Sequence, residues 1–293
     1  MFPDFQTFDI ATNGTTIHGV IIGGSGPPLL LLHGYPQTHV MWHKVAPDLA
    51  QRYTLVIPDL RGYGASGKPP TDADHSPYSK REMARDMAGV MSHFGHTRFA
   101  VLAHDRGARV AHRLAVDHAD RVSAMILLDI APTREMYANT TAAFATVYWH
   151  WFWLIQDAPF PETQIAADPL FYLNKKLRSW GNKPKPFSDA AFAAYAEAIK
   201  DPATIHAMCE DYRAAATIDI THDDEEGMIT CPLHVLWGAE GAIEAHFDCL
   251  DLWKQRATTV TGHNLPGGHY LAEELPDMVA QEALQFFAAQ PRW

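Results

Sequence analysis

Five short apolar runs alternate with helical patterns along this 293-residue chain, and that alternation is the feature that most restricts its fold. The runs are LLLLH at 29–33, TLVIP at 54–58, FAVLA at 99–103, AMILL at 124–128 and LHVLW at 233–237. Short apolar strands separated by helices are typical of a mostly parallel sheet that is covered on both faces. The sequence therefore predicts an α/β fold.

The alternation is interrupted between residues 134 and 215. This segment reads as a series of Ala- and aromatic-rich helices without a convincing strand, and the strand pattern resumes at CPLHVLWG. We interpret it as an inserted helical cap over a core made of residues 1–133 and 216–293. Catalytic groups in open α/β sheets gather at the carboxyl ends of the strands, where such a cap would cover them.

Charge and composition exclude several classes of partner. The formal net charge of −11 argues against nucleic acid and against an anionic membrane surface. No run approaches the roughly 18 apolar residues of a membrane span, and the N-terminus lacks the basic and apolar regions of a signal peptide. The three cysteines show no CxxC spacing. We expect a cytoplasmic protein that binds neither nucleic acid nor membrane.

The sequence gives no indication of a cofactor. GYGASG at 62–67 matches the GxGxxG pattern, but the KPPTDADHSP that follows cannot open the helix that a dinucleotide site requires. We expect neither a metal nor an organic cofactor in the reaction.

The stretch AHDRGARV places Asp105 between an apolar run and a helical pattern. This junction resembles the nucleophile elbow of α/β-hydrolases, small-x-nucleophile-x-Gly, which usually carries serine. A carboxylate in that place is suited to attack a saturated carbon and form an ester that water then cleaves. Aspartate is also a good helix N-cap, and position alone does not separate the two interpretations.

A base and an orienting acid would complete this chemistry. His269, in the glycine-rich loop GGHYLAEELP, is the favoured base, and His263 is its rival. Asp129, after AMILL, is the first choice for the carboxylate that orients the imidazole, with Glu240 as the alternative.

The groups that would bind the substrate lie next to the elbow. The backbone N–H groups of Arg106 and Tyr35 are the expected oxyanion hole. Arg106 and Arg109 stand three residues apart on one face of a helix, where they could hold a substrate carboxylate in bidentate fashion. The alternative is that both are ordinary surface arginines.

An ordered set of motifs resembles the haloacetate (fluoroacetate) dehalogenases of the α/β-hydrolase superfamily. The set runs through PPLLLLHGYPQTHVMWHKVAP, PDLRGYGASGKP, HDRGARV, LDIAPT, YWHWFW, CEDYRAAATIDITHD and LPGGHYLAEE. The resemblance implies that Asp105 attacks the α-carbon of a haloacetate, and that His269, oriented by Asp129, activates water against the ester. It also implies that Arg106 and Arg109 clamp the substrate carboxylate.

The resemblance further implies a halide-binding trio, His150, Trp151 and Tyr212, and a pocket residue, Trp180. An aromatic core helix is the alternative for the segment that carries the first two. Tyr35 stands where the family usually has phenylalanine, which we expect to place a hydroxyl at the pocket mouth. A homodimer is implied by the family alone.

The resulting hypothesis is a hydrolase that converts a haloacetate and water to glycolate and halide through a covalent aspartyl ester. An epoxide hydrolase with the same Asp-His-Asp triad is the alternative, which the tyrosines of the cap keep open. That family usually has tryptophan directly after the nucleophile, where this chain has Arg106. A third hypothesis is a protein of the same fold that only binds a small acid.

Overall fold

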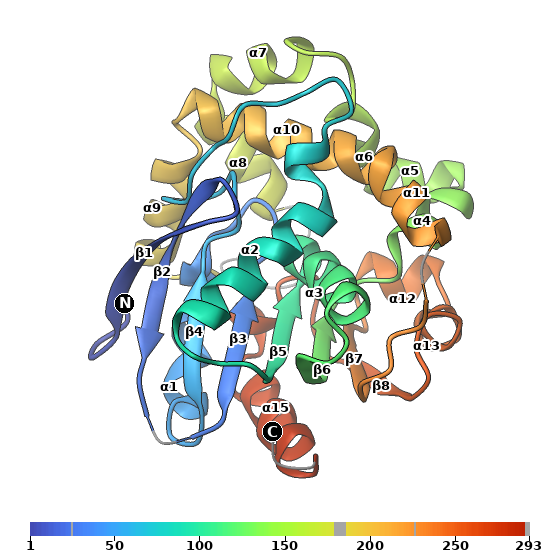
Figure 1. The fold of residues 1–293 in the computed structure, drawn as a ribbon. Helices are drawn as coiled ribbons and strands as arrows, with labels where there is room; N and C mark the ends of the chain where they lie inside the picture. The colour runs from blue at the N-terminus through green and yellow to red at the C-terminus, as the bar shows by residue number, and fades with distance from the viewer. Residues whose placement is uncertain (25, 179–185, 226, 291–293) are drawn as a thin grey trace.

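The computed structural model describes residues 1–24, 26–178, 186–225 and 227–290. An eight-stranded sheet forms its centre, with the order β1-β2-β4-β3-β5-β6-β7-β8 (Figure 1). The strands are β1 (Gln6–Thr12), β2 (Thr15–Ile22), β3 (Pro28–Leu32), β4 (Thr54–Pro58), β5 (Phe99–His104), β6 (Val122–Leu128), β7 (Leu233–Gly238) and β8 (Val260–Leu265). All neighbours from β4 to β8 pair in parallel, so the predicted α/β fold is confirmed.

Three of these strands do not appear among the predicted apolar runs. β1 and β2 form an antiparallel hairpin, and Asn13 and Gly14 between them have φ angles of 45° and 74°. Positive φ at both positions is the signature of the tight hairpin turn that Asn-Gly favours. β8 escapes the prediction because it is an edge strand, VTGHNL, with half of its side chains in contact with solvent.

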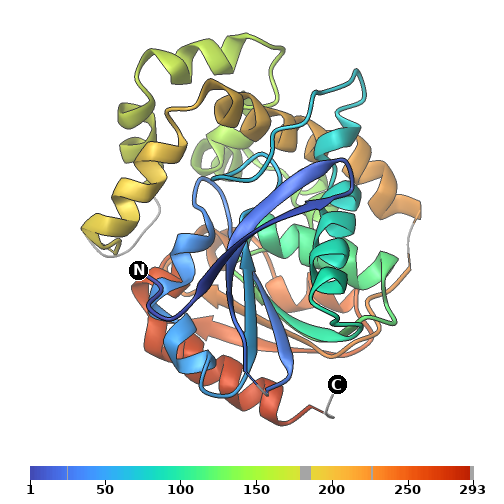
Figure 2. The same cartoon turned by 60° about the vertical axis from the view of Figure 1, so that its left-hand side comes forward.

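Helices cover both faces of the sheet. α2 (Lys80–His93) and α3 (Asp105–Asp117) pack on one face, and α1 (Ala46–Leu49) and α15 (Pro276–Ala288) lie on the other (Figures 1 and 2). The remaining core helices are the 3-10 helices η1 (His39–Lys44) and η2 (Ser76–Tyr78), and α12 (Ala242–His246), α13 (Cys249–Lys254) and α14 (Leu271–Glu274).

Between β6 and β7 the described chain forms helices and no strand. They are α4 (Thr133–Ala138), α5 (Ala142–Val147), α6 (Trp149–Trp153), α7 (Phe160–Ala167), α8 (Pro169–Arg178), α9 (Asp189–Ala198), α10 (Pro202–Ala216) and α11 (Ile218–Glu225). These helices gather over one end of the sheet, at the top of Figure 1. The cap boundaries at 134 and 215 stay a prediction, and Trp180 lies outside the described residues.

The apolar runs form the centre of the core. Every residue of β4 and β5 is buried, because helices cover both faces of these strands. Among the described residues, no helix combines the length and the apolar character that crossing a membrane requires.

Candidate active site

The turn from β5 to α3 holds Asp105 in a left-handed conformation, with φ of 45°. Two glycines let the backbone come close enough for this turn. A Cβ on Gly107 would lie 2.4 Å from the carbonyl oxygen of His33, and one on Gly34 would lie 2.6 Å from the Cβ of Asp105. The N-cap interpretation of Asp105 is wrong, because α3 begins at Asp105 itself and its N-cap is His104.

The two carboxylate oxygens of Asp105 have different surroundings. Oδ1 accepts a hydrogen bond from the backbone N–H of Tyr35 at 2.9 Å. Oδ2 lies 3.9 Å from Nε2 of His269, which is too far for a direct hydrogen bond. The arrangement fixes one oxygen and leaves the other available to react.

Asp105 is buried, with 4% of its surface exposed, yet it is readily ionised. Burial alone would raise its pKa. Electrostatic interactions with the imidazoles of His269 and His104, and then with Arg109 and Arg106, outweigh burial and lower the pKa of Asp105 to about 2. The carboxylate is therefore charged, as a nucleophile must be.

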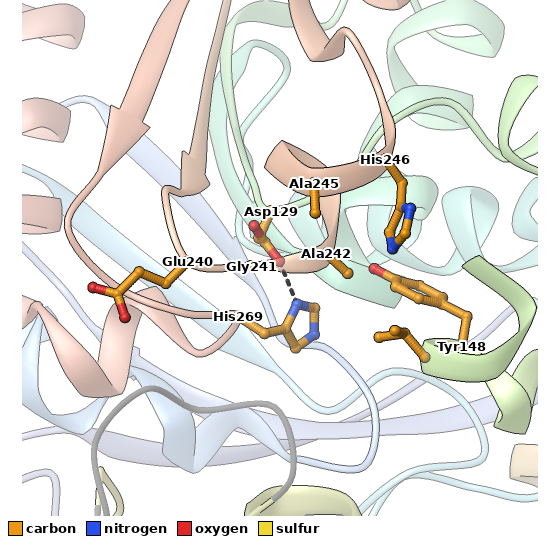
Figure 3. A pocket seen from close by; sticks show the side chains of 9 residues that line it. Asp129, Tyr148, Glu240, Gly241, Ala242, Ala245, His246 and His269 are labelled. Carbon is orange, nitrogen blue, oxygen red and sulfur yellow. Dashed lines mark hydrogen bonds and ion pairs between the residues drawn. The ribbon is translucent and has the colours of Figure 1, made fainter. Parts of the chain in front are cut away.

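His269 and Asp129 meet beside this carboxylate. Nδ1 of His269 lies 2.6 Å from Oδ2 of Asp129, and Oδ1 of Asp129 accepts a hydrogen bond from the backbone N–H of Gly238 at 2.9 Å (Figure 3). Glu240, the alternative acid, points away from the imidazole in the same view. The rival base His263 lies on β8 and pairs with Glu282. The structure thus brings together the first choices and not their alternatives.

His104 is a functional neighbour that the sequence analysis missed. Its Nε2 donates a hydrogen bond to the carbonyl of His269 at 2.8 Å, and the two ring centres are 4.7 Å apart. Burial lowers the pKa of His104 to about 3, with the charge of His269 adding to the effect. A neutral His104 therefore supports the loop that carries the base. Its position directly before the nucleophile was the available signal.

Arg106 is fully buried, so the surface interpretation of this arginine is wrong. Its Nε donates to Oδ2 of Asp211 at 2.8 Å, and its Nη2 donates to Oδ1 at 2.6 Å. The guanidinium carbon also lies 4.2 Å from the ring centre of Tyr212. Burial by itself would lower the pKa of Arg106, but Asp211 raises it well above its usual range. Nη1 has no hydrogen-bond partner among the described residues.

Arg109 is also buried, but its partners are neutral. Nη1 donates to the carbonyl of Ala131 at 3.1 Å and to Oγ1 of Thr133 at 2.8 Å, and the guanidinium lies 4.7 Å from the ring of Trp151. Burial and then the charge of Arg106 lower the pKa of Arg109. Its Nε is unpartnered within the described chain.

The three residues of the expected halide site converge from two helices between β6 and β7. His150 and Trp151 come from α6 and Tyr212 from α10, and each is at most 1% exposed. The ring centre of Tyr212 lies 5.6 Å from that of His150 and 6.5 Å from that of Trp151. The Nε1 of Trp151 and the hydroxyl of Tyr212 have no hydrogen-bond partner in the described part of the chain.

Lys176, from α8, is a second residue that the sequence analysis missed. It is buried, and its Nζ lies 3.2 Å from Nδ1 of His150. Burial lowers the pKa of Lys176 well below its usual range, and the nearby Asp105 opposes this. Nothing in the local sequence distinguishes it from its exposed neighbour Lys175, so only the packing of α8 against α6 reveals it.

The expectation for the Tyr35 hydroxyl is wrong. Tyr35 is 1% exposed, and its ring is stacked on His150 with ring centres 5.9 Å apart. Its hydroxyl hydrogen-bonds to the hydroxyl of Tyr172 instead of standing at a pocket mouth. α8 brings Tyr172 down onto this position.

A pocket of about 210 Å³ reaches the pair of His269 and Asp129 from outside (Figure 3). Ala242 and His246 of α12 form one of its sides, and Tyr148 forms another. The ring of Tyr148 also packs on Trp151, with ring centres 5.3 Å apart. Tyr148 therefore borders both this pocket and the buried donors around Asp105.

Comparisons with known proteins place the chain in a family. The model of the alpha/beta hydrolase fold matches residues 27–274. A fluoroacetate dehalogenase from Burkholderia sp is 41% identical over 98% of this chain and 95% of its own. A soluble epoxide hydrolase from Corynebacterium sp. (strain C12) is 32% identical over 94% and 95%.

A solved structure gives the same result. The crystal structure described as an alpha/beta hydrolase from Nostoc sp PCC 7120 superposes with a TM-score of 0.97, at 51% identity, over 99% of this chain and 100% of that one. Fold, elbow and sequence identity agree, and the chain belongs to the α/β-hydrolase superfamily and, within it, to the haloacetate dehalogenase family.

Proposed function

We propose that the protein is a hydrolytic dehalogenase that converts a haloacetate and water to glycolate and halide. The observation that carries the proposal is a group of four buried donors near Asp105 that have no partner among the residues the structure describes. They are Nη1 of Arg106, Nε of Arg109, Nε1 of Trp151 and the hydroxyl of Tyr212. Leaving buried donors unsatisfied is costly, and a small molecule with an anionic and a halogen end would satisfy all four.

In the first step, Oδ2 of Asp105 attacks the carbon that bears the halogen. A carbon–oxygen bond forms, the carbon–halogen bond breaks, and the halide leaves with the bonding electron pair. Arg106 and Arg109 hold the carboxylate of the substrate, and their charge reduces its repulsion from the attacking Asp105.

The departing halide needs donors that are already in place. Trp151 and Tyr212 supply an indole N–H and a phenol O–H in a site from which water is excluded. In its ammonium form, Lys176 donates to Nδ1 of His150, which lies 3.2 Å from its Nζ. The ring proton of a neutral His150 is then on Nε2.

In the second step, Nε2 of His269 takes a proton from water while the oxygen of that water attacks the ester carbonyl of Asp105. The oxyanion develops on Oδ1, which already accepts the N–H of Tyr35. Asp129 stabilises the imidazolium, which gives its proton to the departing oxygen as the intermediate collapses and glycolate is released. The carboxyl group of Asp105 then loses its remaining proton to solvent, which restores the carboxylate. The pocket beside His269 and Asp129 supplies a route for this water.

An epoxide hydrolase remains the second candidate for one reason. The unpartnered hydroxyl of Tyr212 could polarise an epoxide oxygen as well as receive a halide, and a 32% identical relative is a soluble epoxide hydrolase. A neutral epoxide, however, leaves Nη1 of Arg106 and Nε of Arg109 without a partner. The carboxylate of a haloacetate accounts for both of these donors.

The test is a parallel assay with fluoroacetate, chloroacetate and styrene oxide, following halide by ion-selective electrode and diol by chromatography. Fluoride release that is lost in Asp105→Asn and kept in the control His263→Ala would support the proposal. Release of chloride without release of fluoride would limit the proposal to substrates with better leaving groups than fluoride. Diol alone, or no covalent adduct in His269→Ala, would refute it.

A homodimer and a cytoplasmic location complete the proposal. The family resemblance supports the dimer. Light scattering on the eluting protein would test it, with a mass of about twice the 32.6 kDa chain as the expected result.

A further inference from the structure

A cluster of metal-ligating side chains lies far from the active site, where β7, β8 and α15 meet. His234 is the second residue of β7, whereas Gly238, which contacts Asp129, is its last. At about 3.3 Å per residue, roughly 13 Å of strand separates the two. We propose that His234, His263 and Glu282 bind a first-row divalent transition metal such as Zn²⁺, which joins the two strands to the C-terminal helix.

His234 is the preorganised ligand of the three. It is nine-tenths buried, its ring is stacked on Phe286 with ring centres 5.1 Å apart, and its Nδ1 lies 2.8 Å from Oγ1 of Thr261. A ring held in this way through Nδ1 presents the lone pair of Nε2, which is how second-shell groups orient metal-bound histidines. Nε2 has no hydrogen-bond partner among the described residues.

The ligand atoms lie close to the spacing that a tetrahedral site requires. Oε2 of Glu282 lies 3.6 Å from Nε2 of His234, and Oε1 lies 3.3 Å from Nε2 of His263. The three ligand atoms all lie within 4.8 Å of one another. Bonds of about 2.0–2.1 Å to zinc require neighbouring ligands roughly 3.3–3.5 Å apart, so small side-chain rotations suffice.

The donor set selects the class of metal. Two imidazoles and one carboxylate suit Zn²⁺, Ni²⁺, Co²⁺ or Cu²⁺ and are a poor match for Mg²⁺ or Ca²⁺, which prefer oxygen ligands. Oε2 of Glu282 lies 3.6 Å from Nε2 of His234, beyond the usual length of a direct hydrogen bond. The side chain of His263 is 49% exposed, so an ion can enter and water can complete its coordination.

The experiment is a titration of the metal-stripped, full-length protein with ZnSO₄ in a calorimeter, followed by thermal unfolding with and without Zn²⁺. The variants are His263→Ala and Glu282→Gln, both with partly exposed side chains, and the control is His93→Ala, an exposed histidine on α2. We expect one equivalent of Zn²⁺ to bind and to raise the unfolding temperature of the wild type and the control.

The two site variants should bind Zn²⁺ at least about tenfold more weakly and lose the thermal shift. Absence of a one-equivalent site in the wild type, or equal affinity in all four proteins, would overturn the proposal. Dehalogenation should continue in both site variants, since none of the three ligands lies in the active site.

Discussion

Replacing Lys176 with methionine tests whether this buried lysine prepares the halide site. The change removes the donor 3.2 Å from Nδ1 of His150 and leaves a side chain of similar length. A hydrogen bond from a charged donor contributes about 1.5–3 kcal/mol, which corresponds to a rate factor of roughly 10 to 100. The loss should fall on kcat for fluoroacetate, because fluoride depends most on its donors as it leaves.

Chloride is a larger, weaker acceptor and a better leaving group, so kcat for chloroacetate should fall by about fivefold or less. The assay is steady-state halide release from both substrates, with kcat and KM determined separately. Lys175→Met is the matched control, since Lys175 is the exposed neighbour on the same helix. Lys176→Gln, whose amide can still donate, should recover part of the fluoride rate.

Folding does not confound this comparison. Burial lowers the pKa of Lys176, so its charged form destabilises the folded state. This destabilisation is complete at pH values below the pKa that Lys176 has in the folded state. It disappears above the pKa of lysine in the unfolded chain, about 10.4. Lys176→Met should therefore unfold at no lower temperature than the wild type at pH 7. Equal losses for both substrates, or a loss matched by Lys175→Met, would refute the role assigned to Lys176.

Three further predictions concern the acids of the site. Asp129→Asn should slow ester hydrolysis about 10³- to 10⁴-fold while alkylation continues, so intact-mass spectrometry should detect one carboxymethyl group on Asp105. Asp211→Asn leaves Arg106 buried without its carboxylate and should cost about 3–5 kcal/mol in urea unfolding; a change below 1 kcal/mol would contradict the pairing. The pKa of Asp105 is lowered to about 2, which keeps this carboxylate ionised above pH 4. The rate of halide release in the first turnover, measured by rapid quench, should therefore be constant from pH 4 to 8 and fall only below pH 4.

The sequence predicts the elbow well because the elbow is made locally. A strand, a tight turn and a helix are adjacent in the chain, and Gly107 is needed where α3 passes the backbone of His33. The β1–β2 hairpin has an equally local signal in Asn13-Gly14, which a pattern of apolar runs does not include. β8 has no such local signal, because an edge strand is only half apolar.

The partners of the site residues could not be predicted in the same way. Asp211 stands directly before Tyr212 in CEDYRA, yet successive helical side chains point about 100° apart. Only the packing of α10 against α3 shows that the carboxylate holds Arg106 while the tyrosine ring lies against the same guanidinium. The contact of Lys176 with His150 likewise depends on two helices that are separate in sequence.

These contacts divide the work of the two arginines. Asp211 pairs with both Arg106 and Lys80, so it offsets only part of the charge of Arg106. Arg109 is held only by neutral acceptors, so its full charge is available to balance Asp105. An incoming haloacetate adds a second anion to a buried site, and Lys176 is close enough to sense Asp105. Anion binding favours the ammonium form, so the pKa of Lys176 must rise when substrate enters. The positive charge of Lys176, which burial disfavours, is thus stabilised when a haloacetate is bound.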